Sequence, residues 1–199
     1  MSGTTSSLHA DALRVLRGWT APDAGQAALR DRYASHLEGN PTGVFRGCFP
    51  DHLTASSLIV SADGAQVLLT LHAKAGAWFQ TGGHCEATDA TLAGAALREA
   101  VEESGIDRLA LDPEPVQLDA HEVAFCDPRG PVHHLDVRFL AVAAPDAVHA
   151  ASAESLDVRW WPADDLPTQE PSLLDLVRRA RARLVLTDIV SISRPIGRG

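Results

Sequence analysis

The sequence predicts an α/β fold in which a mixed β-sheet lies between helical layers, with a helical extension at the N-terminus. Three observations support this class. Segments typical of strands lie on both sides of one central helical pattern, another helical pattern follows the last of them, and two more precede the first. A chain of 199 residues accommodates one domain with a full core but not two ordinary domains.

The chain divides into three expected parts: a helical N-terminal extension over residues 1–45, a main domain over residues 46–185 and a C-terminal tail over residues 186–199. The extension carries two helical patterns, residues 8–19 and 23–37, separated by a break that contains proline and glycine. A Gly- and Pro-rich connection then leads into the main domain. The extension could act as a lid, a dimer contact or a stabilising support.

The main domain opens with a predicted β-hairpin. Residues 53–61 and 65–73 are typical of strands, and they flank Asp63-Gly64, a pair that favours a tight turn. Residues 78–83 are expected to form a further short strand that ends in glycines.

A helix is predicted from Asp89 to Ser104. Thr88 or Asp89 could cap its first turn, because short polar side chains accept hydrogen bonds from the free backbone N–H groups there. Gly105 suits the left-handed conformation that commonly follows the end of a helix.

Strands and one helix complete the predicted domain. Strand patterns cover residues 116–126, 133–144 and 157–162, and the turn sequence Asp-Pro-Arg-Gly-Pro separates the first two. A last helix is predicted over residues 170–186, where apolar residues recur at helical spacing: Leu173, Leu174, Val177 and Leu184.

Composition excludes some classes of function. The formal net charge of -9 argues against general binding to nucleic acid or to anionic membranes, which requires clustered Lys and Arg. The N-terminal residues lack the pattern of a signal peptide, and no apolar run approaches the roughly 18 residues of a membrane span, so we expect a cytoplasmic protein. The three cysteines, Cys48, Cys85 and Cys126, have no spacing typical of a disulfide framework.

Three glutamates gather near the end of the central helix. At about 100° per residue, Glu99, Glu102 and Glu103 project within about 100° of arc. Leu97 and Val101 fall on the opposite side, where we expect them to be buried against the sheet, so the glutamates should face a cleft.

Like charges at this spacing destabilise a helix by a few tenths of a kcal/mol per pair, so another interaction must offset them. Arg98 could pair with Glu102, but a single arginine cannot neutralise three carboxylates. A divalent cation such as Mg²⁺ or Mn²⁺ could, because it prefers clustered oxygen ligands. The alternative is a solvated helix face, which is the role of most glutamate runs.

Residues from Gly82 to Ile106, "GGHCEATDATLAGAALREAVEESGI", resemble the signature of the Nudix hydrolase family. Its second half is matched position by position by Arg98, Glu99, Ala100, Glu102, Glu103, Gly105 and Ile106. The order of the predicted strands and the later segment "RWWPADDLP" are also similar to the family's domain.

Two departures from the family's pattern fall in the loop. The segment between Gly83 and Arg98 is one residue longer than usual, and Asp89 replaces the glutamate expected near its middle. In addition, Thr81 stands where many members have proline.

The resemblance implies a Nudix-type α/β/α sandwich with a mixed β-sheet. It also implies hydrolysis of a nucleoside diphosphate linked to another group, by attack of water on phosphorus, with Mg²⁺ or Mn²⁺ as cofactor. The implied metal ligands are Glu99, Glu102, Glu103 and the carbonyl of Gly83, and Arg98 would orient the glutamates.

Further site residues are less specific. The family often adds a carboxylate from outside the signature, for which Glu154 is the first candidate and Glu122 the second, although either could be an ordinary surface glutamate. Substrate contacts could come from His84, Lys74 and Arg138. Equally, His84 could only pack, Lys74 could be a surface charge of a hairpin, and Arg138 could form a structural ion pair with Asp136 or Asp157.

A zinc site is a weaker possibility. Histidines and cysteines in the main domain could supply ligands, but their spacings match no common zinc pattern: His84, Cys85, His121, Cys126, His133 and His134.

Two alternatives to an active Nudix hydrolase remain. One is a Nudix-like module that senses or binds nucleotides without catalysis, although such proteins usually lack some of the glutamates retained here. The other is an isopentenyl diphosphate isomerase, for which no convincing catalytic pair is found around Cys48 or Cys85. The expected partner is a small nucleotide or diphosphate, with a homodimer as a possible assembly.

Overall fold

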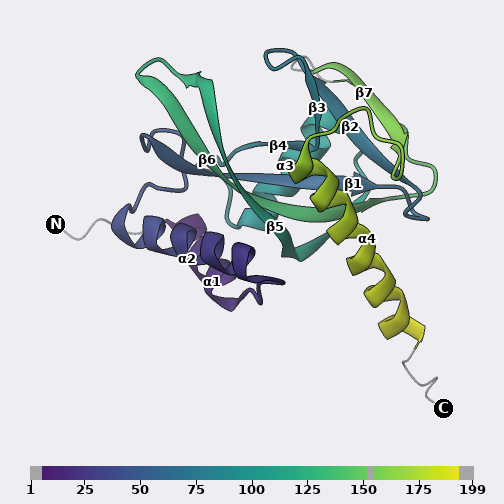
Figure 1. Ribbon diagram of the computed structural model, residues 1–199, viewed down its shortest axis with the longest axis horizontal. Helices are drawn as coiled ribbons and strands as arrows, with labels where there is room; N and C mark the ends of the chain where they lie inside the picture. The colour runs from purple at the N-terminus through teal and green to yellow at the C-terminus, as the bar shows by residue number, and fades with distance from the viewer. Residues whose placement is uncertain (1–5, 152–154, 193–199) are drawn as a thin grey trace.

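The computed structural model describes residues 6–151 and 155–192, whose strands form one seven-stranded mixed sheet flanked by helices (Figure 1). The helices are α1 (Ser7–Gly18), α2 (Ala24–Gly39), α3 (Leu92–Ser104) and α4 (Pro171–Ile192). The strands are β1 (Asp51–Val60), β2 (Gln66–His72), β3 (Ala77–Phe79), β4 (Thr81–His84), β5 (Leu109–Asp127), β6 (Gly130–Ala143) and β7 (Ser155–Pro162). The predicted α/β class and the helical N-terminal region are confirmed.

The sheet is mixed because β1 and β6 are parallel, whereas the other strand pairs are antiparallel. The parallel register places Asp51 opposite His133 and Val60 opposite Val142. The strands lie in the order β3-β2-β1-β6-β5, while β4 pairs with β1 and β7 pairs with β2. β5 and β6 form a long hairpin that extends beyond the rest of the sheet (Figure 1).

The two faces of the sheet are covered by different helices. On β1, Ile59 belongs to a buried cluster with Ala100 of α3, whereas its neighbour Leu58 belongs to a cluster with Leu176 of α4. Successive side chains of a strand point to opposite faces, so α3 and α4 cover opposite faces of the sheet. Figure 1 shows α4 crossing the sheet in this view.

The N-terminal helices α1 and α2 belong to the main core. Leu16, Tyr33 and Leu37 are fully buried in the same apolar cluster as Leu53 of β1 and Phe139 of β6. Burial of an aliphatic or aromatic side chain contributes about 1.5–3 kcal/mol, so these helices stabilise the sheet.

Polar contacts also tie the N-terminal helices to the domain. The side-chain amide of Gln26 donates to the carbonyl of Leu118 at 2.9 Å and accepts from the N–H of Leu118 at 2.7 Å. Asp11 of α1 accepts a hydrogen bond from the N–H of Leu92, the first residue of α3, at 2.9 Å. The extension therefore supports both β5 and the start of the central helix.

The start of α3 differs from the sequence prediction. The helix begins at Leu92 rather than at Asp89, and its N-cap is Thr91, whose side chain accepts from the N–H of Gly94 at 3.0 Å. The prediction that Thr88 or Asp89 caps this helix is therefore wrong. Gly105 has a φ of 68°, which confirms the predicted left-handed end.

The face that α3 buries also differs. Leu97 and Val101 are only partly buried. The buried face consists mainly of small residues: Leu92, Ala95, Ala96, Ala100 and Ser104. At about 100° per residue this face lies on the same side as Glu99 and Glu103, so the expectation that the glutamates lie opposite the buried stripe is wrong. Because the alanine side chains are short, the helix can lie close to the sheet.

The last helix is longer than predicted. α4 runs to Ile192, beyond residue 186 and into the region expected to be a tail. Leu173, Leu176 and Val177 bury its first half against the sheet. Within the part of the chain that the structure describes, no helix is both long and apolar enough to cross a membrane.

Candidate active site

The site is built where α3 packs against the glycines of β4. β4 pairs with β1, with Gly83 opposite Ala55. The carboxylate of Glu99 lies over Gly83, since a Cβ atom placed there would be 2.7 Å from Glu99 Cδ. The N–H of Gly82 donates to Glu103 Oε2 at 3.1 Å. Two of the three glutamates therefore touch the glycine strand, and only a glycine at position 83 permits this contact.

Arg98 holds the carboxylates in place. Its Nη1 donates to Glu99 Oε1 at 2.9 Å and to Glu102 Oε2 at 3.0 Å, while its Nη2 donates to the carbonyl of His84 at 3.0 Å. The hydrogen bond to Asp89, followed by the one to Glu99, raises the pKa of Arg98 despite partial burial. The guanidinium is thus a permanent cation that links the glycine strand to the helix.

Asp89, in the loop between β4 and α3, forms an ion pair with Arg98. Its carboxylate accepts from Arg98 Nε at 3.1 Å and from Arg98 Nη2 at 3.0 Å, and it also accepts from the N–H of Glu86 at 2.7 Å. Burial by itself would raise the pKa of Asp89, but these hydrogen bonds outweigh it and lower the pKa. This loop is one residue longer than the Nudix pattern and carries aspartate where the pattern has glutamate. It nevertheless remains joined to α3 through Arg98.

The three glutamates differ in exposure. The side chain of Glu102 is 58% exposed, whereas that of Glu99 is 15% exposed. The site therefore combines one outward carboxylate with others that lie against β4. Clustered hard oxygen ligands with access to solvent fit a divalent cation such as Mg²⁺, which usually retains several waters.

Two predicted residues are exposed on other elements than α3, and a third lies outside the described residues. Lys74 is exposed in the turn between β2 and β3. Glu122 is exposed on β5, where it pairs in register with His133 of β6. Glu154 falls outside the residues that the structure describes. The roles of all three stay predictions.

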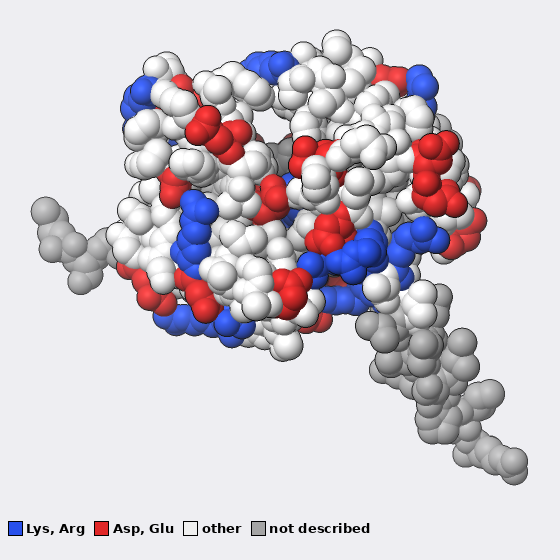
Figure 2. Space-filling view, viewed as in Figure 1, with Lys and Arg blue, Asp and Glu red and all other residues white. Residues whose placement is uncertain are grey.

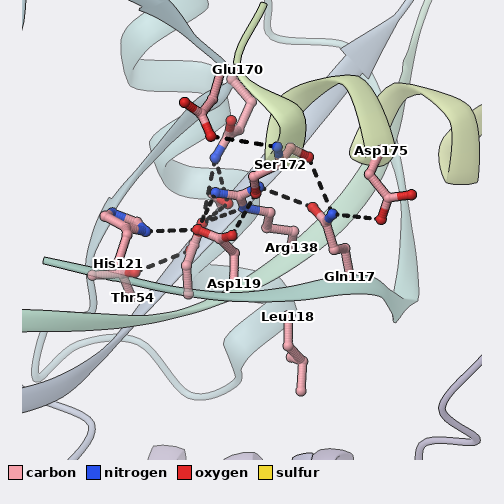
Figure 3. Close-up of polar contacts among 12 residues, drawn as sticks. Thr54, Gln117, Leu118, Asp119, His121, Arg138, Glu170, Ser172 and Asp175 are labelled. Carbon is pink, nitrogen blue, oxygen red and sulfur yellow. Dashed lines mark hydrogen bonds and ion pairs between the residues drawn. The ribbon is translucent and has the colours of Figure 1, made fainter. Parts of the chain in front are cut away.

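Arg138 lies in a buried polar network (Figure 3). Its Nε donates to Asp136 at 2.8 Å and its Nη2 donates to Asp119 at 2.9 Å. Its Nη1 donates to Gln117 at 2.9 Å and to Ser172 of α4 at 2.7 Å. Because Arg138 is only 5% exposed and these partners engage all three of its nitrogens, the geometry favours a structural ion pair over a phosphate contact.

His84 lies in a different environment from the carboxylates. Its Nε2 is 3.4 Å from the Sγ of Cys126, and its ring contacts the rings of His52 and His134. Burial, followed by repulsion from His52, lowers the pKa of His84 to about 4, so its ring is neutral at physiological pH. Of this group, His52 was not among the candidate residues predicted from the sequence.

The face seen in Figure 2 is mostly uncharged, with side chains of both signs scattered over it, and the basic side chains that gather near α4 lie beside acidic ones. Arg179 pairs with Asp175 and Asp23, and Arg183 pairs with Asp112. The charges of these two arginines of α4 are therefore compensated by carboxylates.

Comparison with known proteins identifies the class. A family model for the NUDIX domain matches residues 50–182, a region that includes the sheet, the glycine strand and α3. Fold, site and match together define a hydrolase that acts on phosphoric anhydride bonds. The chain belongs to the Nudix family.

Solved structures show the same fold. A NUDIX-family hydrolase from Clostridium perfringens is 22% identical, with a TM-score of 0.53, over 66% of this chain and 97% of that one. The NUDIX domain of Shewanella oneidensis NrtR, in complex with ADP ribose, is 25% identical, with a TM-score of 0.51, over 66% of this chain and 87% of that one.

A C. elegans Ap4A hydrolase, solved as a binary complex, is 21% identical, with a TM-score of 0.51, over 67% of this chain and 97% of that one. The expected Nudix-type sandwich is thereby confirmed. A comparison with curated proteins gave no match.

Proposed function

We propose that this Nudix hydrolase cleaves a nucleoside diphosphate linked to another group, by metal-assisted attack of water on phosphorus. One observation carries the proposal: the carboxylate of Glu99 lies against Gly83, while Glu102 and Glu103 stand beside it on the same helix. This arrangement concentrates hard oxygen ligands at one point next to a glycine strand.

In this proposal the chain's own residues hold the ion and set its position. Glu99, Glu102, Glu103 and the carbonyl of Gly83 would be the ligands of Mg²⁺ or Mn²⁺. The ion, when bound, supplies neutralisation of the diphosphate, polarisation of the P–O bond and a lowered pKa of bound water. Arg98 orients the glutamates through its hydrogen bonds to Glu99 and Glu102.

The substrate class is supported by two of the similar structures. One contains ADP ribose and another is an Ap4A hydrolase, and both compounds carry a nucleoside linked to another group through a phosphoric anhydride. The net charge of -9 also favours a small ligand over a nucleic acid. We propose Glu154 as the catalytic base and Glu122 as the second candidate.

A substrate panel tests the proposal. ADP-ribose, nucleotide sugars, Ap4A and nucleoside triphosphates are incubated with the protein and Mg²⁺ or Mn²⁺, and release of nucleoside monophosphate is measured by chromatography. At least one anhydride-linked compound should be hydrolysed, and a chelator should stop the reaction. Tight binding of a panel compound without hydrolysis would instead identify a nucleotide-binding module.

Two matched variants test the assigned residues. Glu103→Gln should lower turnover by at least about a hundredfold and leave the fold intact, because it removes a charged ligand but keeps the shape of the side chain. Glu38→Gln, at an exposed glutamate of α2, should retain full activity. Undiminished turnover in Glu103→Gln would refute the assigned role.

A further inference from the structure

Three histidines and one cysteine converge where β4, β1, β6 and β5 lie side by side. They are His84 of β4, His52 of β1, His134 of β6 and Cys126 of β5, and one ligand atom from each lies within 4.8 Å of all the others. We propose that these side chains bind one zinc ion in a tetrahedral site separate from the carboxylates of α3. The inference does not depend on the proposed catalytic activity.

The spacing of the donor atoms fits such an ion. The Sγ of Cys126 lies 3.4 Å from His84 Nε2 and 3.3 Å from His134 Nε2. A zinc ion with ordinary bond lengths to sulfur and nitrogen would hold those atoms about 3.5 Å apart in a tetrahedron. The two sulfur–nitrogen pairs therefore already lie within a few tenths of an ångström of the tetrahedral spacing, and all four donor atoms lie within 4.8 Å of one another.

The three imidazole rings are arranged symmetrically. Their centroids are 5.1 Å apart for His52 and His84, 5.0 Å for His52 and His134, and 5.0 Å for His84 and His134. Rings that radiate from one tetrahedral zinc through their nitrogens have centroids about 5 Å apart. The distances between the ring centroids thus already match those that a shared ion would impose.

His52 provides an independent sign of a ligand. Its side chain is fully buried, and its Nδ1 lies 3.1 Å from the carbonyl oxygen of Cys48. That contact requires the proton on Nδ1, which leaves a lone pair on Nε2. Among the described residues, the buried Nε2 of His52 has no hydrogen-bond partner. A histidine whose second nitrogen is fixed by a backbone carbonyl is the usual arrangement of a metal ligand.

Hydrogen bonding within the group does not serve all four donors as an ion would. Cys126 can donate its one proton to His84 or His134 and accept from the other, but among the described residues no hydrogen bond reaches Nε2 of His52. Thiolate and imidazole donors favour zinc over Mg²⁺, which prefers oxygen. Four protein ligands leave no open position for water, so the ion would be structural. It would fasten the hairpin of β5 and β6 to the strand that carries Gly82 and Gly83.

A ring bound to this ion would not also contact a phosphate. The proposal therefore replaces the predicted substrate contact of His84 with a metal ligand, whereas its backbone carbonyl still accepts from Arg98. The zinc site and the carboxylate site would meet at the end of β4, with separate ligands.

Metal analysis of the purified full chain tests the proposal directly. Mass spectrometry should find about one zinc per chain, and protein reconstituted with Co²⁺ should show the thiolate-to-cobalt charge-transfer band and the intense visible bands of a tetrahedral site. Protein that neither retains zinc nor develops these bands would overturn the inference.

Matched variants identify the ligands. Cys126→Ser should lose the charge-transfer band, whereas Cys48→Ser should keep it, because Cys48 offers only its backbone carbonyl to the site. His134→Asn should lower zinc affinity by at least about a hundredfold, whereas His133→Asn, at a partly exposed neighbour paired with Asp51, should not. A charge-transfer band that survives Cys126→Ser would contradict the assignment.

Two further measurements identify the donor atoms of the zinc site and separate this site from the proposed catalytic site. X-ray absorption at the zinc edge of the wild-type chain should show one sulfur and three nitrogen neighbours, and any other donor set contradicts the proposal even if the variants fail to fold. Glu103→Gln should retain zinc while losing turnover, so failure of the zinc site and failure of the proposed catalytic site give different results.

Discussion

Asp89 and Arg98 form a two-pronged ion pair, with Arg98 Nε donating to Oδ1 at 3.1 Å and Arg98 Nη2 donating to Oδ2 at 3.0 Å. The pair joins the loop after β4 to the helix that carries the glutamates. Since Arg98 also donates to Glu99 and Glu102, a change at Asp89 should be transmitted to the carboxylates through one guanidinium.

Asp89→Asn should therefore lower turnover although Asp89 touches neither water nor phosphate in the proposed mechanism. The amide removes the charge and one of the two acceptors, so Arg98 is held less firmly. Loss of such an orienting partner typically costs about 10–100-fold in activity or metal affinity. Steady-state rates at several Mg²⁺ concentrations measure the effect. Asp146→Asn, in an exposed pair with Arg108, is the control and should change neither the turnover nor its dependence on Mg²⁺ concentration.

Alanine at Gly83 should mainly lower activity, whereas alanine at Gly82 should mainly lower stability. In Gly83→Ala the new methyl group meets the end of the Glu99 side chain at 2.7 Å, so the carboxylate should move and turnover should fall at least about tenfold with little change in stability. In Gly82→Ala the methyl group meets Ser56 Cβ at 2.2 Å, so the strand itself must shift, at a cost of about 1–3 kcal/mol.

Urea denaturation and activity assays on both glycine variants separate these effects. If Gly83→Ala remained fully active, the closeness of Glu99 to the glycine strand would have no catalytic importance.

The contact between Asp11 and α3 predicts a role for the N-terminal helices. Asp11→Ala removes the acceptor of the N–H of Leu92 and should lower the free energy of unfolding by about 1 kcal/mol, the usual cost of a lost helix cap. Asp11 also pairs with Arg14, so Arg14→Ala serves as the control, since it removes the ion pair but keeps the hydrogen bond from Leu92 to Asp11. Equal losses of unfolding free energy in the two variants would show that this hydrogen bond contributes nothing.

Stability should depend on pH through Asp119. Burial by itself would raise its pKa, but the hydrogen bond from His121, the charge of Arg138 and the hydrogen bond from Ser172 outweigh burial and lower the pKa to about 2, below the usual 3.8. A lowered carboxyl pKa means that the stabilising contribution is complete above the usual value and is lost as the pH falls toward about 2.

Urea denaturation between pH 5 and pH 2 checks this expectation. The wild-type chain should lose stability more steeply below about pH 4 than Asp119→Asn, which lacks the titrating group. Parallel curves for the two proteins would show that Asp119 makes no such contribution.

Local patterns were enough to predict most elements and the main candidate site. The strands of the first hairpin, the helix that ends at Gly105 and the spacing of Arg98, Glu99, Glu102 and Glu103 all appear in consecutive sequence, because helix and strand periodicity are short-range properties. The predictions of the end of α4 and of the cap of α3 were less accurate. At the start of α3, several neighbouring polar residues could each act as the cap: Thr88, Asp89 and Thr91.

The sequence by itself determined the class of fold, the family and the glutamate-bearing helix, because these depend on residues close together along the chain. Only the tertiary structure decided which face of α3 is buried and that Arg138 pairs with Asp136 and Asp119. It also brought His52 beside His134, which are remote in sequence but opposite each other in the parallel pairing of β1 and β6. Strand pairing of this kind is a long-range property, so no spacing along the chain could reveal the four-residue cluster.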